Sequence, residues 1–187
     1  GLAGPVSHWV HTSRSATDVA ADGARAVAVA REHPGQIATL ILPANTAWDE
    51  GSGPAPVVGI PEQPKVDAEA VTHAARVLRS GTSVALVMTG HAVREQGLAT
   101  AGRIAAATGA KLFAQGSNAR IERGAGRVPI NRIPFVVDQA LEMLAPYEHI
   151  ILVGAKPPVA FFAYPGKPSV LTPEGCPLHQ LAALEQD

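Results

Sequence analysis

From Val66 to its end, the chain alternates between helical and extended apolar patterns, and this alternation constrains the fold most. Stretches with helical spacing separate short, mostly apolar runs such as Ser83–Met88 and His149–Val153. Continuous apolar runs of this length are typical of parallel strands that are covered on both faces. The order therefore predicts an α/β fold, with a parallel sheet flanked by helices and joined by right-handed crossovers.

The individual elements follow from these periodicities and from the Gly and Pro breaks between them. We expect helices over Asp67–Ser80, Glu95–Thr108, Phe135–Leu144 and Leu178–Leu184. We expect strands over Ser83–Met88, Lys111–Ala114, His149–Val153 and Ser169–Leu171. The Gly-, Asn- and Arg-rich stretch Gln115–Pro134 is expected to be a long irregular excursion, and Val159–Ala163 fits either a helical turn or an extended segment.

The first 50 residues predict only half of a parallel α/β unit. A helix over Thr17–Arg31 is followed by Pro34-Gly35 and by the β-branched and Leu run Ile37–Leu42, which is typical of a strand covered on both faces. A half-unit cannot bury its own faces. We therefore expect residues 1–50 to be the end of a domain whose start is missing, residues 51–65 to be a Gly- and Pro-rich linker, and residues 66–187 to be a separate domain.

The composition fits an ordinary soluble globular chain, with 17% charged and 47% hydrophobic residues. A net charge of -1 gives no electrostatic reason to bind nucleic acid or an acidic membrane surface. No apolar run approaches the roughly 20 residues of a membrane span. The single cysteine, Cys176, excludes an internal disulfide, is expected to be a structural thiol, and fits a cytoplasmic location.

In open parallel sheets, ligands bind beyond the carboxyl ends of the strands. The predicted strand ends carry five candidates for a nucleotide pocket: Gly90, His91, Gly116, Gly154 and Lys156. Glycines there let backbone amides approach a phosphate; alternatively, they only turn the chain. For His91 the choice is between a hydrogen-bonding or general-acid role and an exposed or helix-capping side chain.

The excursion carries a local positive charge, with Arg120, Arg123, Arg127 and Arg132 and only Glu122 as an acid. This cluster fits a phosphate or carboxylate clamp; the alternatives are a solvated loop or a contact with an adjacent domain. The seven histidines show no metal-ligand spacing. No nucleophile elbow and no Walker loop is present either. The sequence thus predicts no metal site and no catalytic residue.

The expected strand that ends in Leu-Pro-Ala-Asn-Thr (residues 42–46), the linker after it and the new α/β unit together resemble the thiamine-diphosphate-dependent enzymes of the acetolactate synthase and benzoylformate decarboxylase type. In that family the pyrimidine-binding domain ends in a strand with a Leu-Pro-Ala-Asp-type sequence, and a linker leads into a Rossmann-like central domain. The resemblance implies that residues 1–50 are the end of the first domain and residues 66–187 the central domain.

What the resemblance implies for chemistry lies outside this segment. In the family, a Glu early in the first domain activates thiamine diphosphate, and a Gly-Asp-Gly motif in a third domain holds the diphosphate and Mg²⁺. This chain has no Gly-Asp-Gly, so no catalytic residue carries over. The implied parent is a lyase or transferase acting on 2-oxo acids, a homo-oligomer whose missing N- and C-terminal domains are the partners of this segment. Central domains of the family hold FAD or ADP in some members, and a free-standing module that binds FAD, NAD or ADP is the alternative interpretation.

Overall fold

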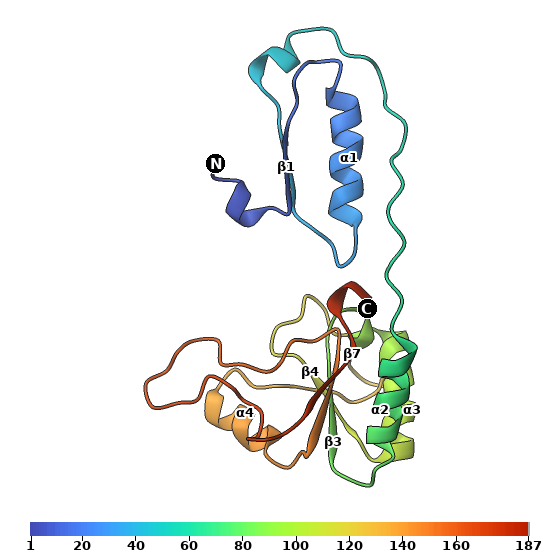
Figure 1. Cartoon of the computed structure of the whole chain (residues 1–187), viewed down its shortest axis with the longest axis vertical. Helices are drawn as coiled ribbons and strands as arrows, with labels where there is room; N and C mark the ends of the chain where they lie inside the picture. The colour runs from blue at the N-terminus through green and yellow to red at the C-terminus, as the bar shows by residue number, and fades with distance from the viewer. Residues whose placement is uncertain (187) are drawn as a thin grey trace. The chain divides into compact units, whose positions relative to one another are not determined.

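The computed structural model describes residues 1–186 and divides the chain into two compact units, Gly1–Pro64 and Lys65–Asp187. Each unit is described here by itself (Figure 1). Residues 48–67, all of them described, hold neither helix nor strand. The 16 prolines and 18 glycines of the chain include many in this stretch, which explains its irregular backbone.

The N-terminal unit is a small parallel βαβ arrangement. Strand β1 (Trp9–Thr12) pairs in parallel with β2 (Ala38–Ile41), and helix α1 (Val19–Arg31) forms the crossover between them. Short 3₁₀ turns, η1 (Gly4–Val6) and η2 (Ala44–Ala47), lie at the two ends of this arrangement. Helix α1 and strand β2 agree with the prediction, whereas β1 was not predicted from the sequence.

The run Ile37–Leu42 is not covered on both faces by the residues described, as expected for a half-unit that cannot bury its own faces. Ile37, Ile41 and Leu42 are 57%, 43% and 52% exposed. The physical reason is that β2 has only one neighbouring strand and only α1 packs against the pair, so Ala28 is the one buried residue of α1. A parallel sheet of two strands is too small to cover its own apolar side chains.

The C-terminal unit contains a five-stranded sheet in the order β5-β4-β3-β6-β7, with every neighbouring pair parallel. Its strands are β3 (Val84–Met88), β4 (Lys111–Ala114), β5 (Asn131–Arg132), β6 (His149–Val153) and β7 (Leu178–Ala182). Its helices are α2 (Ala68–Leu78), α3 (Glu95–Thr108) and α4 (Val137–Leu144). The 3₁₀ turns are η3 (Gly90–Val93) and η4 (Leu184–Gln186). The predicted parallel α/β fold is confirmed.

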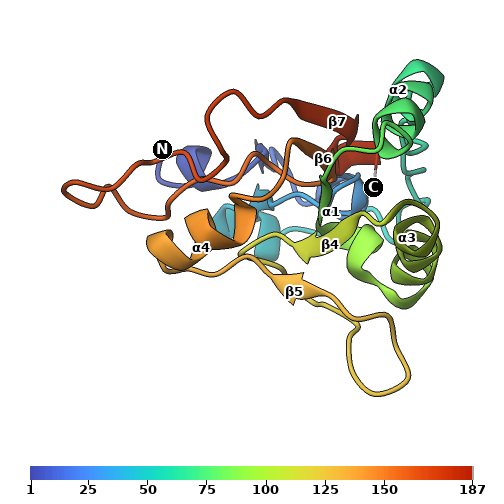
Figure 2. The same ribbon diagram turned by 90° about the horizontal axis from the view of Figure 1, so that it is seen from below.

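Helices cover both faces of this sheet, with α2 and α3 on one face and α4 on the other (Figure 2). The central strand β3 is buried along its whole length and supplies alternate residues to two cores. Leu86 and Met88 pack in the core beneath α2 and α3, while Ala85 and Val87 pack in the core beneath α4. This two-sided burial is why the strand reads as a continuous apolar run in the sequence.

Two predicted elements near the C-terminus are wrong. Leu178–Leu184 is not a helix, because Leu178–Ala182 pairs in parallel with β6 and forms the edge strand β7. Ser169–Leu171 is not a strand of the sheet, since Val170 makes only an isolated antiparallel bridge to Val159. Pairing with β6 outweighs the helix propensity of the Leu- and Ala-rich segment.

Candidate functional site

The carboxyl edge of the sheet brings the five predicted site residues to one end of the C-terminal unit. Gly90 and His91 follow β3, Gly116 follows β4, and Gly154 and Lys156 follow β6. Because β3 lies between β4 and β6, the three strand exits are neighbours. The role proposed for these residues in binding a nucleotide remains a prediction.

Three of these residues line two separate cavities at this edge of the sheet. Gly116 and Lys156 line a cavity of about 330 Å³ together with Gln115, Phe135 and Phe161. His91 instead lines an apolar groove of about 560 Å³ beside α3 and β7, whose walls include Met88, Ile104 and Leu181. His91 and Lys156 therefore line different cavities.

The two glycines that follow β3 and β6 turn the chain. Gly90 has φ +62° and Gly154 has φ +65°, a left-handed conformation that favours glycine. The Gly154 amide donates to the Ala182 carbonyl at 2.9 Å and is thereby committed to the sheet. At these two positions, the geometry favours the turning role over direct contact with a ligand.

Other backbone donors at this edge are also engaged within the chain. The Gln115 amide donates to the Met88 carbonyl at 2.9 Å, and the Lys156 amide donates to Gln115 Oε1 at 2.9 Å. Thr89, which is buried, donates its amide to the Val153 carbonyl and its hydroxyl to Asn118 Oδ1. These amides and the Thr89 hydroxyl thus already donate hydrogen bonds within the protein, where a diphosphate would otherwise accept them.

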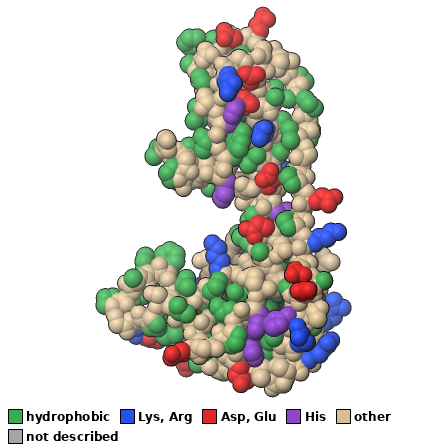
Figure 3. Space-filling view, in the orientation of Figure 1, with side chains coloured by type: hydrophobic (Ala, Val, Ile, Leu, Met, Phe, Trp, Pro, Cys, Tyr) green, Lys and Arg blue, Asp and Glu red, His purple; other side chains and the backbone are tan. Residues whose placement is uncertain are grey.

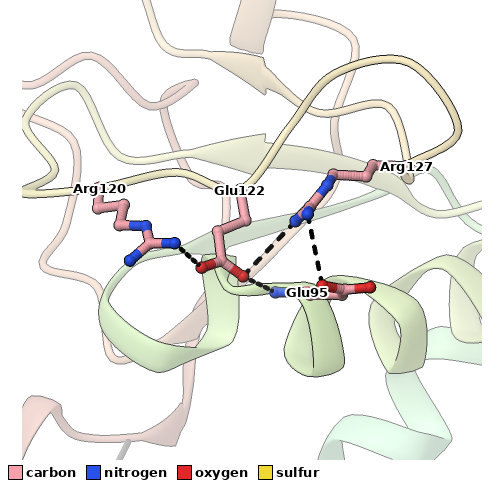
Figure 4. A network of polar contacts seen from close by, with 4 residues as sticks. All are labelled: Glu95, Arg120, Glu122 and Arg127. Carbon is pink, nitrogen blue, oxygen red and sulfur yellow. Dashed lines mark hydrogen bonds and ion pairs between the residues drawn. The ribbon is translucent and has the colours of Figure 1, made fainter.

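A charged network joins the irregular excursion to the start of α3 (Figure 4). Glu122 accepts a hydrogen bond from the Glu95 amide at 2.7 Å and forms an ion pair with Arg120 at 2.6 Å. Arg127 lies 3.6 Å from Glu122 and 3.4 Å from the Glu95 carboxylate. The hydrogen bond from the Glu95 amide, followed by the nearby arginines, lowers the pKa of Glu122. The spacing of these residues in the sequence does not indicate this network, although Glu122 stands out as the only acid of the excursion.

The predicted positive charge of the excursion is thus partly neutralised. Arg120 and Arg127 pair with Glu122, whereas Arg123 and Arg132 contact no carboxylate among residues 1–186. Glu174 precedes β7 and so lies away from the carboxyl ends of the strands. Burial raises the pKa of the Cys176 thiol, as expected for a structural cysteine.

A chain of three histidines on the C-terminal unit was missed because its members are far apart in the sequence. His73 Nε2 lies 2.9 Å from His179 Nδ1, and His179 Nε2 lies 3.1 Å from His149 Nδ1. The rings come from α2, β7 and β6, and Figure 3 shows histidine side chains (purple) gathered on this unit. Desolvation, then the neighbouring His73 and His149, lower the pKa of His179.

This histidine chain predicts that the C-terminal unit loses stability as the solution becomes mildly acidic. Because the pKa of His179 is lower in the folded than in the unfolded state, the unfolded state binds more protons as the pH falls through about 6.5. The free energy of unfolding is therefore highest above that pH and decreases below it. Urea titrations between about pH 8 and pH 5.5 should show this decrease in the free energy of unfolding with falling pH, and His179→Gln should make the decrease smaller. His8→Gln, which removes an imidazole from the other unit, should leave the decrease unchanged.

No group of three or more His, Cys, Asp and Glu side chains among residues 1–186 could hold a metal ion. The donor set of the described residues therefore does not fit a Mg²⁺–diphosphate site, which needs several oxygen ligands around one ion. In that same part of the chain, no helix is long and apolar enough to span a membrane.

The chain is similar to proteins that depend on thiamine diphosphate, although no protein-family model matches it. It is 42% identical over 181 residues to a Mycobacterium tuberculosis (strain ATCC 25618 / H37Rv) protein provisionally named as the acetolactate synthase large subunit IlvX. That alignment covers 97% of this chain and 35% of the relative. The chain thus spans about a third of the length of the curated relative it matches.

Solved structures extend this similarity. A thiamin diphosphate-dependent enzyme from Mycobacterium smegmatis, itself provisionally assigned, has a TM-score of 0.74 and 25% identity, covering 95% of this chain and 34% of that enzyme. The thiamine diphosphate-dependent 4-hydroxybenzoylformate decarboxylase of Rhodococcus jostii RHA1 shares the fold, with a TM-score of 0.73, 18% identity and the same two coverages. The benzoylformate decarboxylase of Polynucleobacter necessarius also shares it, with a TM-score of 0.65, 20% identity, and coverage of 95% of this chain and 33% of that enzyme. This chain is therefore similar to thiamine-diphosphate-dependent enzymes, and it spans about one third of the length of each of them.

Proposed function

We propose that this chain serves as the structural central domain, together with the end of the pyrimidine-binding domain, of a thiamine-diphosphate-dependent enzyme that acts on 2-oxo acids. The observation that carries the proposal is the coverage: 97% of this chain aligns with only 35% of the relative from M. tuberculosis. Residues 1–50 would be the end of the first domain, residues 51–65 the linker, and residues 66–187 the central domain.

The open N-terminal unit supports this assignment. Its two-stranded parallel sheet leaves Ile41 and Leu42 about half exposed, as expected for strands that pack against further parts of the same domain. The C-terminal unit, by contrast, has a sheet covered on both faces and two continuous cores. We propose that the missing N- and C-terminal domains are the partners of this segment, in a cytoplasmic homo-oligomer.

Thiamine diphosphate and Mg²⁺ would be held by those other domains, and this chain would be inactive alone. The absence of a metal-ligating group among residues 1–186 supports this division of roles. The proposed parent is a lyase or transferase related in its chemistry to acetolactate synthases or 2-oxo acid decarboxylases.

Calorimetric titration of the purified chain with thiamine diphosphate and Mg²⁺ tests this proposal. We expect no heat of binding, whereas the decarboxylase of Rhodococcus jostii RHA1, run alongside, should bind the cofactor. A dissociation constant in the micromolar range, corresponding to about -8 kcal/mol, would show that this chain itself contains the cofactor site and would refute the proposal.

The alternative function is a nucleotide-binding module formed by residues 66–187. The cavity at the carboxyl edge, lined by Gly116 and Lys156, is the observation in its favour. FAD, NAD and ADP should then raise the melting temperature, since ligand at a hundred times its dissociation constant adds about 2.7 kcal/mol to stability. An unchanged melting temperature with all three would exclude this alternative.

A further inference from the structure

The N-terminus of α3 already holds an anion, the carboxylate of Glu122. Its Oε2 atom accepts from the Glu95 amide, the first amide of the helix, at 2.7 Å. A helix N-terminus attracts negative charge because its free amides and its dipole point toward the ligand. Glu122 therefore occupies the position in which a helix after the first strand of a parallel sheet ordinarily offers its amide to a phosphate.

The surrounding residues fix the Glu122 carboxylate in this place. Its own amide donates to the Val93 carbonyl at 3.0 Å, which ties the excursion to the turn before α3. Arg120 and Arg127 contact the two carboxylate oxygens, and the side chain is only 18% exposed. The Glu95 amide and the two arginines favour the ionised carboxylate and so lower the pKa of Glu122.

The turn between β3 and α3 is closed by the protein backbone as well. A Cβ atom at Gly97 would lie 2.6 Å from the Ala92 carbonyl oxygen, so η3 packs directly against the first turn of α3. Val93 of the same turn is fully buried. In nucleotide-binding folds, glycines at this connection let a pyrophosphate approach, whereas here Gly97 lets another part of the chain approach.

We propose that Glu122 excludes nucleotide phosphates from α3, so that this central domain does not take FAD, NAD or ADP in the way the fold allows. The inference rests on the proposed function, because it concerns the central domain of that enzyme. It makes Glu122 a residue that determines specificity by filling the phosphate position with a carboxylate from its own chain. The amides of Gln115 and Lys156 at the neighbouring strand ends also donate within the chain, so they do not offer hydrogen bonds to a nucleotide phosphate.

Two-dimensional NMR of the complete 187-residue chain tests this proposal through the Glu95 amide, with inorganic pyrophosphate and ADP as probes. In the wild type, neither probe should shift the Glu95 amide resonance. In Glu122→Ala, the freed Glu95 amide, with Arg120 and Arg127 no longer held by Glu122, should give a shift that saturates, with an affinity for pyrophosphate at least roughly tenfold above that of the wild type. Glu95→Gln is the matched control, because it removes a carboxylate from the same helix end and leaves the Glu122 hydrogen bond in place.

Each outcome decides the proposal. A saturable shift of the Glu95 amide in the wild type would overturn it, since the site would then be open with Glu122 present. Failure of a folded Glu122→Ala variant to gain pyrophosphate binding would overturn it too. If Glu122→Ala does not fold, Glu122→Ser, whose side chain is polar but too short to reach the Glu95 amide, replaces it. Thiamine diphosphate is absent from these titrations, so their failure is distinguishable from failure of the proposed function.

Discussion

Gly97→Ala should lower the free energy of unfolding of the C-terminal unit by about 1–3 kcal/mol. In an open helix, this change would add up to about 1 kcal/mol of stability, because alanine has the higher helix propensity. Here the added Cβ would lie 2.6 Å from the oxygen and 2.8 Å from the Cα of Ala92, and backbone atoms cannot move aside as a flexible side chain can. Urea denaturation followed by circular dichroism measures the loss as a lower midpoint at an unchanged slope.

Gly102→Ala is the matched control, because Gly102 lies in the same helix. Its added Cβ would meet Val128 Cγ2 at 2.8 Å, a side-chain atom that can shift. We therefore expect a change of less than about 1 kcal/mol in either direction, from the balance of propensity and packing. Equal effects of the two substitutions would show that the contact between η3 and α3 is not rigid.

Leu144→Ala should have an effect of about 2–5 kcal/mol on the same unit. Leu144 is the last residue of α4 and has no exposed surface. It packs in the core with Val87, Phe113 and Ile150, so its removal leaves a cavity that these side chains cannot close completely. The expected result is a large drop in the urea midpoint with the sheet otherwise intact.

Leu178→Ala makes the same chemical change on the edge strand β7, where the side chain is 37% exposed. Less apolar surface is returned to water there, so the loss should be clearly smaller than for Leu144→Ala. If the two variants lose the same stability, the core beneath α4 is packed more loosely than the structure indicates.

Much of the fold could be predicted because local signals agree with tertiary packing. Glu95–Thr108 is a helix with the predicted limits, ended by Gly109 in the left-handed conformation, and Lys111–Ala114 is the predicted strand. The predictions that failed concern segments whose structure depends on pairing with a distant strand. Leu178–Ala182 has helix-forming residues, yet it completes the sheet beside β6 as a strand.

The candidate site was predictable only in part. Parallel topology alone places Gly116 and Lys156 at one edge, so their proximity follows from the order of the elements. The capping of α3 by Glu122 and the histidine chain through His179 depend on contacts between distant segments. Their side chains carry no periodicity or motif, which is why no sequence pattern points to them.

The ion pairs of Glu122 with Arg120 and Arg127 have a practical consequence for protein engineering. Arg120 and Arg127 hold both ends of the short exposed segment between them against Glu122. The glycines Gly124 and Gly126 at its tip have positive φ and open space around them. Exposed tips whose flanks are anchored tolerate inserted residues well. This tip is thus the natural place in the C-terminal unit for a fluorescent label or an affinity tag.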